Sequence, residues 1–245
     1  MISFIFYMKA PVLVFFLVFS PYINEVFSQN GNGLEITYRK NITLDQEVIS
    51  GGYFVDPPKE YEGHPYFITR NFESSEITIN GLNYKGVPLL YNIWEDQVLT
   101  FHPIHKQKIL IRSDKINAFT LQLDTSVSFV RLEDNPSYSH HGSGIYESLG
   151  DGPARLLIKH RKLTRSKREV SIFSKEFYEE QDYFLKKNGE ILKVANRKQA
   201  IDFLALEKKA VKRLSRASNL YFRTDKKDYL SLLVELYNQA QDEKK

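Results

Sequence analysis

Cysteine is absent from the 245 residues of this chain, and the absence excludes several kinds of chemistry at once. Without thiols there can be no disulfide bond, no thiolate-bound metal and no cysteine nucleophile. The remaining composition is ordinary for a globular protein, with 42% hydrophobic and 26% charged residues. It argues against a disordered chain, a collagen-like repeat and a protein with many membrane spans.

Apolar runs are short as well. Ala10–Phe19 is apolar and follows Lys9, but it is far shorter than the ~20 residues that a membrane-spanning helix needs. The small residue Ser28, two positions after Val26, suits a signal peptidase, so residues 1–28 are predicted to be a secretory signal peptide. The alternative, an anchor that stays on the protein, is disfavoured because polar residues closely follow the apolar run.

After cleavage, the chain is expected to be exported without a transmembrane span, and to be periplasmic, secreted or associated with the outer membrane. No cysteine lies near the cut, which excludes a bacterial lipoprotein anchor. Because disulfides are absent in spite of export, burial of a hydrophobic core must stabilise the mature chain. Its net charge of +4 is too small to indicate a polyanionic partner by itself.

Residues 29–75 are expected to form an irregular lead with short strands, and residues 76–195 an antiparallel β domain. The second region has short β-branched and aromatic runs separated by turn residues, which is typical of consecutive antiparallel strands. Asn-Gly dipeptides at 80–81 and 188–189 predict two-residue hairpins, because such turns need positive φ at both positions.

The expected strands cover Glu76–Ile79, Leu82–Tyr84, Val87–Trp94, Gln97–Phe101, Lys108–Arg112, Ile116–Leu123, Val127–Leu132, Ile145–Leu149, Ala154–Leu163 and Phe177–Val194. Within Ile116–Leu123 the residues alternate between two faces. Phe119 and Leu121 share a mostly apolar face with Asn117, whereas Ile116 is placed on the opposite face.

Residues 196–245 are expected to form C-terminal helices that pack on the β domain. The period of the pattern changes to 3.6 beyond Asn196, which suits a helix N-cap, and two short helices are predicted before a longer one that starts near Asp225. The last helix carries a continuous apolar stripe of Tyr229, Leu232, Leu233, Leu236, Tyr237 and Ala240. The predicted fold is therefore α+β, a predominantly antiparallel sheet (a meander, a curved sheet or a sandwich) with a short C-terminal helical segment.

The strongest concentration of charge is basic and lies on a predicted strand. Its candidate contact residues are Arg155, Lys159, Arg161, Arg165 and Lys167. They are predicted to contact another envelope protein or an anionic envelope polymer such as lipopolysaccharide or a teichoic-type polymer. Nucleic acid is not expected as a partner because the chain is exported. The alternative is a basic strand edge that guards against aggregation, since only every second residue of a strand shares a face.

Two further clusters are candidates for chemistry. His140 and His141 stand in a polar loop, but adjacent residues of an extended chain point in opposite directions, and Ser143 lacks the spacing of a nucleophile elbow. The sequence also has an acidic cluster, made of Glu179, Glu180 and Asp182. A solvated strand face is favoured there over paired catalytic carboxylates.

The leading hypothesis is a non-catalytic binding module of the cell envelope, because no polar residues stand at a reactive spacing and no cofactor or metal is expected. One alternative is a carrier of a lipid or other apolar ligand in a curved sheet. Its cavity would be lined by Tyr91, Trp94, Phe101 and Phe119. The other alternative is an envelope hydrolase that uses His140, His141 or the acidic strand.

One part of the sequence resembles a known group of proteins. Gly63-His64-Pro65-Tyr66-Phe67 and the later Pro88–Trp94 segment, PLLYNIW, are similar to the "GSPYL…PLRYNIY" pattern of exported Bacteroidetes proteins of unknown function. His64 replaces the usual Ser, and Leu90 stands where those relatives carry Arg. The resemblance continues more loosely at Arg155–Lys162, at Tyr183–Val194 and in the lysine-rich helical tail. It implies a secreted or periplasmic β-rich protein with a helical C-terminus, and it brings no activity, cofactor or catalytic residue.

Overall fold

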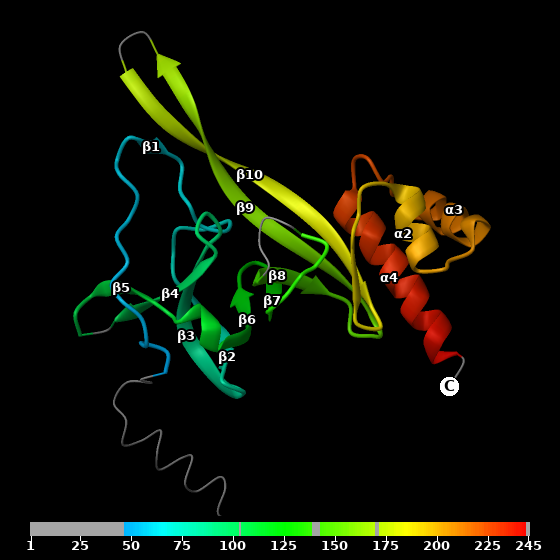
Figure 1. Cartoon of the computed structure of the whole chain (residues 1–245), viewed down its shortest axis with the longest axis horizontal. Coiled ribbons are helices and arrows are strands. Elements are labelled where there is room, and N and C mark those ends of the chain that lie inside the picture. Colours follow the sequence, from blue (N-terminus) through cyan, green and yellow to red (C-terminus); the bar gives the residue numbers. More distant parts are fainter. Residues whose placement is uncertain (1–46, 103, 139–142, 170–171, 244–245) are drawn as a thin grey trace, which may run out of the picture. The chain divides into compact units, whose positions relative to one another are not determined.

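The computed structural model describes residues 47–102, 104–138, 143–169 and 172–243, all within one unit, Leu44–Lys245. The predicted signal peptide, the lead as far as residue 46, and the candidates His140 and His141 lie outside the described residues. Among the described residues, strands form an 11-stranded sheet in the order β1-β10-β9-β8-β7-β6-β2-β3-β4-β5, with β11 also paired to β10 (Figure 1). The sheet is antiparallel except where β1 runs parallel to β10. The predicted α+β fold, dominated by an antiparallel sheet, is confirmed.

The strands are β1 (Tyr61–Glu62), β2 (Glu73–Ile79), β3 (Leu82–Asn92), β4 (Gln97–His102), β5 (Gln107–Leu110), β6 (Ile116–Gln122), β7 (Ser126–Leu132), β8 (Gly144–Leu149), β9 (Ala154–Glu169), β10 (Ile172–Lys187) and β11 (Glu190–Lys193). A short 3-10 helix, η1 (Ser113–Lys115), precedes β6. The β9–β10 pair forms a long two-stranded ladder that extends beyond the end of β8 (Figure 1).

Both predicted Asn-Gly hairpins are confirmed. Asn80 and Gly81 have φ of 50° and 79° between β2 and β3, and Asn188 and Gly189 have φ of 50° and 87° between β10 and β11. Positive φ at both positions matches the right-handed twist of the flanking strands, which is why this dipeptide closes tight hairpins.

Two irregularities set which side chains enter the core. Gly86, with φ of 70°, is the extra residue where β3 bulges against β2, a backbone conformation that side chains with a Cβ rarely adopt. Asn117 is the extra residue where β6 bulges against β2, because Ile79 pairs with Ile116 and Thr78 with Ala118. The bulge turns Ile116 into the core, where it is 2% exposed, so its predicted placement on the opposite face from Phe119 is wrong.

The sheet curls so that the turn after β3 meets β9. The backbone N–H of Lys162 donates to the carbonyl of Ile93 at 3.1 Å, and the Lys159 ammonium lies 2.6 Å from the Asp96 carboxylate. The inner face then holds one apolar cluster around Tyr91, Phe119 and Phe129.

Three helices, α2 (Arg197–Phe203), α3 (Lys208–Ala217) and α4 (Lys226–Asp242), lie beside the β9–β10 half of the sheet (Figure 1). Asn196 caps α2 as predicted, since its side chain accepts from the Gln199 N–H at 3.0 Å. Asp225 precedes α4, but its carboxylate accepts from Thr224 and from the Tyr221 N–H instead of from the helix.

The final helix packs against both β9 and α3, so it buries a wider arc than the predicted stripe. Leu230 and Val234 are 0% and 1% exposed although neither belongs to that stripe, whereas Leu232 is only half-buried. A helix held between a sheet and a second helix buries residues toward both neighbours. None of the described helices is long and apolar enough to cross a membrane.

Candidate functional site

The predicted basic strand is largely neutralised by the next strand. Arg161 on β9 pairs in register with Glu180 on β10, and its guanidinium lies 3.0 Å from Glu180 and 2.9 Å from Asp182. Lys159 is 1% exposed and is paired with Asp96, so it is not a surface residue at all. The basic and acidic clusters of the sequence therefore bind each other.

Farther along the β9–β10 ladder, Arg165 is 2.9 Å from Glu176 of β10, and Lys167 is 3.0 Å from Glu62 of β1. Arg155 is exposed at the other end of β9, opposite Lys186 in the ladder. The five predicted contact residues are thus spread along β9, four of them with an acidic partner. They do not form a free cationic surface for a polyanion.

His160 lies in a buried charged cluster that the sequence did not reveal. Its Nε2 is 2.7 Å from the Glu147 carboxylate and its Nδ1 is 3.1 Å from Glu179, while Lys227 of α4 also pairs with Glu147. Burial disfavours the imidazolium, but the hydrogen bonds to Glu147 and Glu179 outweigh it and raise the pKa of His160. Hydrogen bonds from His160 and Lys227 overcome the effect of burial and lower the pKa of Glu147.

The His160 ring packs edge-on at 4.8 Å against Phe67, a member of the apolar cluster of β2–β8, while Lys227 of α4 reaches Glu147. Both ring nitrogens are held by carboxylates, and the side chains of Glu147 and His160 are each 4% exposed. Both ring nitrogens are thus engaged within the protein, and the ion pairs of this cluster link β8, β9, β10 and α4.

The four aromatic residues of the predicted carrier cavity do not line an enclosed space. Tyr91 and Phe119 are 1% and 3% exposed and pack edge-to-face at 5.4 Å. Trp94 packs against Phe177 at 5.4 Å, and Phe101 lies 5.8 Å from Phe72. Tyr91 and Phe119 thus belong to a packed core, whereas Trp94 and Phe101 are half-buried, and Phe101 lines an open groove together with Phe72.

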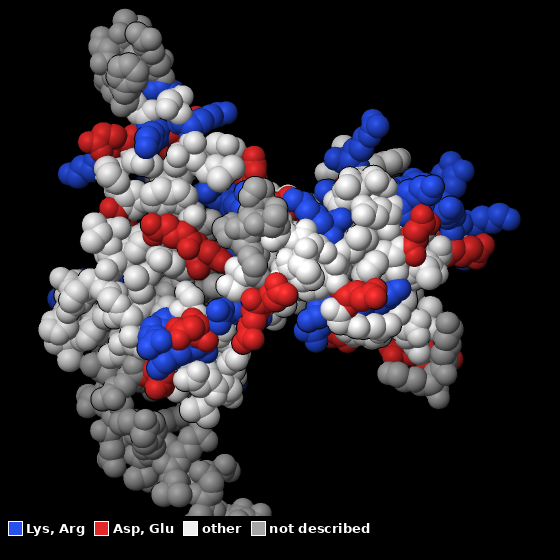
Figure 2. All heavy atoms as spheres, viewed as in Figure 1, with Lys and Arg blue, Asp and Glu red and all other residues white. Residues whose placement is uncertain are grey.

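The exposed positive charge gathers on α3 instead. In the view of Figure 2, Lys and Arg side chains cluster over this helix. The exposed basic residues of α3 are Lys208, Lys209, Lys212, Arg213 and Arg216. The helix itself carries no Asp or Glu, and its ion pair among the described residues is a loose one, between Lys208 and Asp202 at 3.9 Å. Helical spacing of these cations was the signal that could have identified this surface from sequence.

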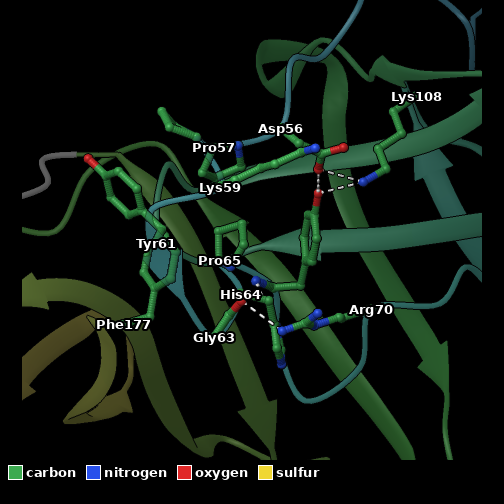
Figure 3. Close-up of a pocket in the computed structure, with 12 residues that line it drawn as sticks. Asp56, Pro57, Lys59, Tyr61, Gly63, His64, Pro65, Arg70, Lys108 and Phe177 are labelled. Atoms are coloured by element: carbon green, nitrogen blue, oxygen red, sulfur yellow. Dashed lines mark hydrogen bonds and ion pairs between the residues drawn. The ribbon is translucent and has the colours of Figure 1, made fainter. Parts of the chain in front are cut away.

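A second feature that sequence reasoning missed is a cleft of about 260 Å³ beside β1 (Figure 3). Its lining includes the cations Lys59, Arg70 and Lys108 together with Asp56 and His64. Asp56 accepts from the Tyr66 hydroxyl and lies 2.6 Å from the Lys108 ammonium, which in turn donates to the Tyr66 oxygen at 2.8 Å. Arg70 donates to the carbonyl of Gly63 at 2.7 Å.

Tyr66 is not poised as a base in this cleft. Burial and the neighbouring Asp56 carboxylate raise its pKa far above the ordinary value of a tyrosine. Burial and the nearby Lys162 and Arg70 lower the pKa of His64, so its ring is neutral near pH 7. The cleft therefore offers hydrogen-bond donors and positive charge rather than a reactive group.

The segment Gly63–Phe67, which lines part of this cleft, pairs with the later segment Pro88–Trp94. Tyr66 forms a β-bridge with Asn92, the Phe67 N–H donates to the Tyr91 carbonyl at 2.8 Å, and the Ile93 N–H donates to Pro65 at 3.0 Å. The segment from Gly63 to Phe67 is thereby fixed along the end of β3.

Comparison with protein-family models, with curated proteins and with solved structures finds no match to this chain. Among the described residues, no group of three or more His, Asp or Glu side chains is arranged to hold a metal ion.

Proposed function

We propose that this chain is an exported, non-catalytic module of the cell envelope that binds an anionic envelope polymer through α3. The observation that supports the proposal is the row of exposed cations on α3, without an acidic residue on the same helix. A polyanion gains from such a row because the charges are fixed on one rigid element, and of its members only Lys208 has an ion pair among the described residues, a loose one with Asp202.

The geometry of α3 suits a linear polymer. Its cations stand at positions i, i+1, i+4, i+5 and i+8, and nine residues of helix extend about 12 Å along the axis at 1.5 Å per residue. Val211 and Ser215 are buried on the other side, so packing fixes which side faces solvent. These features support α3 as the polymer contact in this proposal, in place of the β9 residues predicted from sequence.

A charge-matched pair of variants tests this assignment. One variant replaces Lys208, Lys209, Lys212 and Arg213 with Gln, and the control replaces Arg155, Arg165, Lys167 and Lys175 with Gln. Both lose the same net charge, and glutamine keeps a good helix propensity in α3. Elution from immobilised dextran sulfate along a salt gradient is the measurement, with circular dichroism to check the fold.

We expect the α3 variant to elute at several-fold lower salt than the wild type, and the hairpin control to elute close to the wild type. Equal losses for the two variants would contradict the proposal, since only net charge would then matter.

Export is tested separately. The mass of the protein recovered from its native envelope should match a chain that begins at Gln29.

A further inference from the structure

We propose that the cleft beside β1 and the apolar groove next to it form one site for a small amphiphile with an anionic head group and a single aliphatic chain. The lining residues lie within 53–72 and at 101, 106–108 and 177, so the site is separate from the α3 surface. Phosphate and carboxylate are the head groups that its donors recognise.

The cleft provides excess positive charge for the head group. Lys108 offsets Asp56, because their charged atoms are 2.6 Å apart, and this leaves the exposed Lys59 and Arg70 as the cations without a carboxylate partner in the cleft lining. The Nδ1 atom of His64 accepts from the Tyr66 N–H at 3.2 Å, which places the proton of the neutral ring on Nε2 as a further donor.

The neighbouring groove, of about 510 Å³, provides the surface for an aliphatic chain. It is lined by Phe54, Phe72 and Phe101 together with Tyr53 and Val55. Tyr53 and Val55 are 61% and 84% exposed, which is unusual for two large apolar residues that line one groove. This volume lies within the ~300–1,000 Å³ range of small-molecule sites.

The two hollows adjoin, because Asp56 and Lys108 line both of them. Lys108 lines the groove, and its ammonium lies 4.9 Å from the centre of the ring of Tyr66, which lines the cleft. A purely polar anion would leave the groove exposed to water, and a neutral apolar molecule would leave Lys59 and Arg70 unused. An anionic amphiphile satisfies both halves.

The only tryptophan of the chain reports on this site. Trp94 packs against Tyr61 at 5.8 Å and Phe177 at 5.4 Å, and both of these residues line the cleft. Tryptophan fluorescence of the full mature chain can therefore follow titration with decyl phosphate, decanoate, decyl maltoside or inorganic phosphate, with each of the three amphiphiles kept below its critical micelle concentration.

We expect decyl phosphate or decanoate to bind at least tenfold more tightly than inorganic phosphate and than decyl maltoside. Replacing Lys59 and Arg70 with Gln should weaken binding of the charged amphiphile at least fivefold. Replacing Tyr53 and Val55 with Ser should reduce its affinity to that of inorganic phosphate. The matched control replaces Leu82 and Tyr221, which are 55% and 58% exposed elsewhere, with Ser and should leave the affinity unchanged.

Three results would overturn the proposal. Equal affinity for decyl maltoside and the charged amphiphiles would show that the cations do not contribute. Equal affinity for inorganic phosphate and decyl phosphate would show that the groove does not contribute. Absence of saturable binding by any of the four compounds would remove the site altogether, whatever the outcome for α3.

Discussion

The Lys159 ammonium and the Asp96 carboxylate are 2.6 Å apart, and they join β9 to the turn that follows β3. Lys159 also donates to the carbonyl of Ile145 at 2.9 Å. Asp96 accepts in addition from the Tyr91 hydroxyl at 2.6 Å and from the Ile145 N–H at 3.2 Å. Burial lowers the pKa of Lys159, and Asp96 opposes that effect, so the carboxylate is what keeps a charged lysine in the core.

This arrangement predicts unequal costs for removing the two partners. Asp96→Ala leaves a buried ammonium without its counter-ion and should lower the free energy of unfolding by about 3–5 kcal/mol. Lys159→Met should cost less, under about 2 kcal/mol, because Asp96 keeps two donors and partial contact with water. Urea denaturation followed by circular dichroism measures both values.

The control for this pair is Asp124→Ala, which removes an exposed carboxylate from the turn after β6. Its effect should lie within about 0.5 kcal/mol of zero. If Asp96→Ala were as stable as this control, the ion pair would not hold the two strands together.

The sequence was sufficient for features that depend on neighbouring residues. Asn-Gly turns and the Asn196 cap are decided within a few residues, and both were predicted. The row of cations from Lys208 to Arg216 is likewise local, because residues at positions i, i+1, i+4, i+5 and i+8 lie toward one side of a helix.

The rest depended on register and on contacts between distant segments. Neutralisation of Arg161 by Glu180 needs the register of the β9–β10 ladder, and pairing of Lys159 with Asp96 needs the curl of the whole sheet. The cleft combines Lys59, Lys108 and Phe177 from separate parts of the chain. No local pattern encodes such a combination.

The buried cluster around His160 predicts a specific dependence of stability on pH. Because the pKa of His160 is raised, its contribution is fully present below the ordinary value of 6.5 and is lost as the pH rises through the raised value. The pKa of Glu147 and that of Glu179 are lowered, so their contribution is present above 4.5 and is lost as the pH falls. The cluster therefore stabilises the fold most between these two ordinary values.

His160→Asn isolates this effect because it removes the imidazole and leaves Glu147, Glu179, Lys162 and Lys227 in place. The wild type should exceed the variant in free energy of unfolding by more at pH 6 than at pH 9, as measured by urea denaturation at each pH. His105→Asn, at an exposed histidine, should show no such change with pH. A stability difference that grows toward pH 9 for His160→Asn is the outcome that would contradict the assigned charge state.

Helix α4 is held on the sheet by an apolar contact and by a side-chain amide. Leu233 is 0% exposed in the cluster that joins this helix to β9, and the Asn238 amide exchanges two hydrogen bonds with the backbone of Ala154 at 2.9 and 3.0 Å. Leu233→Asp buries an unpaired charge and should lower the free energy of unfolding by about 3–5 kcal/mol. Gln239→Asp adds the same charge on the exposed side and should change it by less than about 0.5 kcal/mol. Thermal unfolding compares the two variants, and an unchanged melting temperature for Leu233→Asp would mean that the final helix does not contribute to the fold.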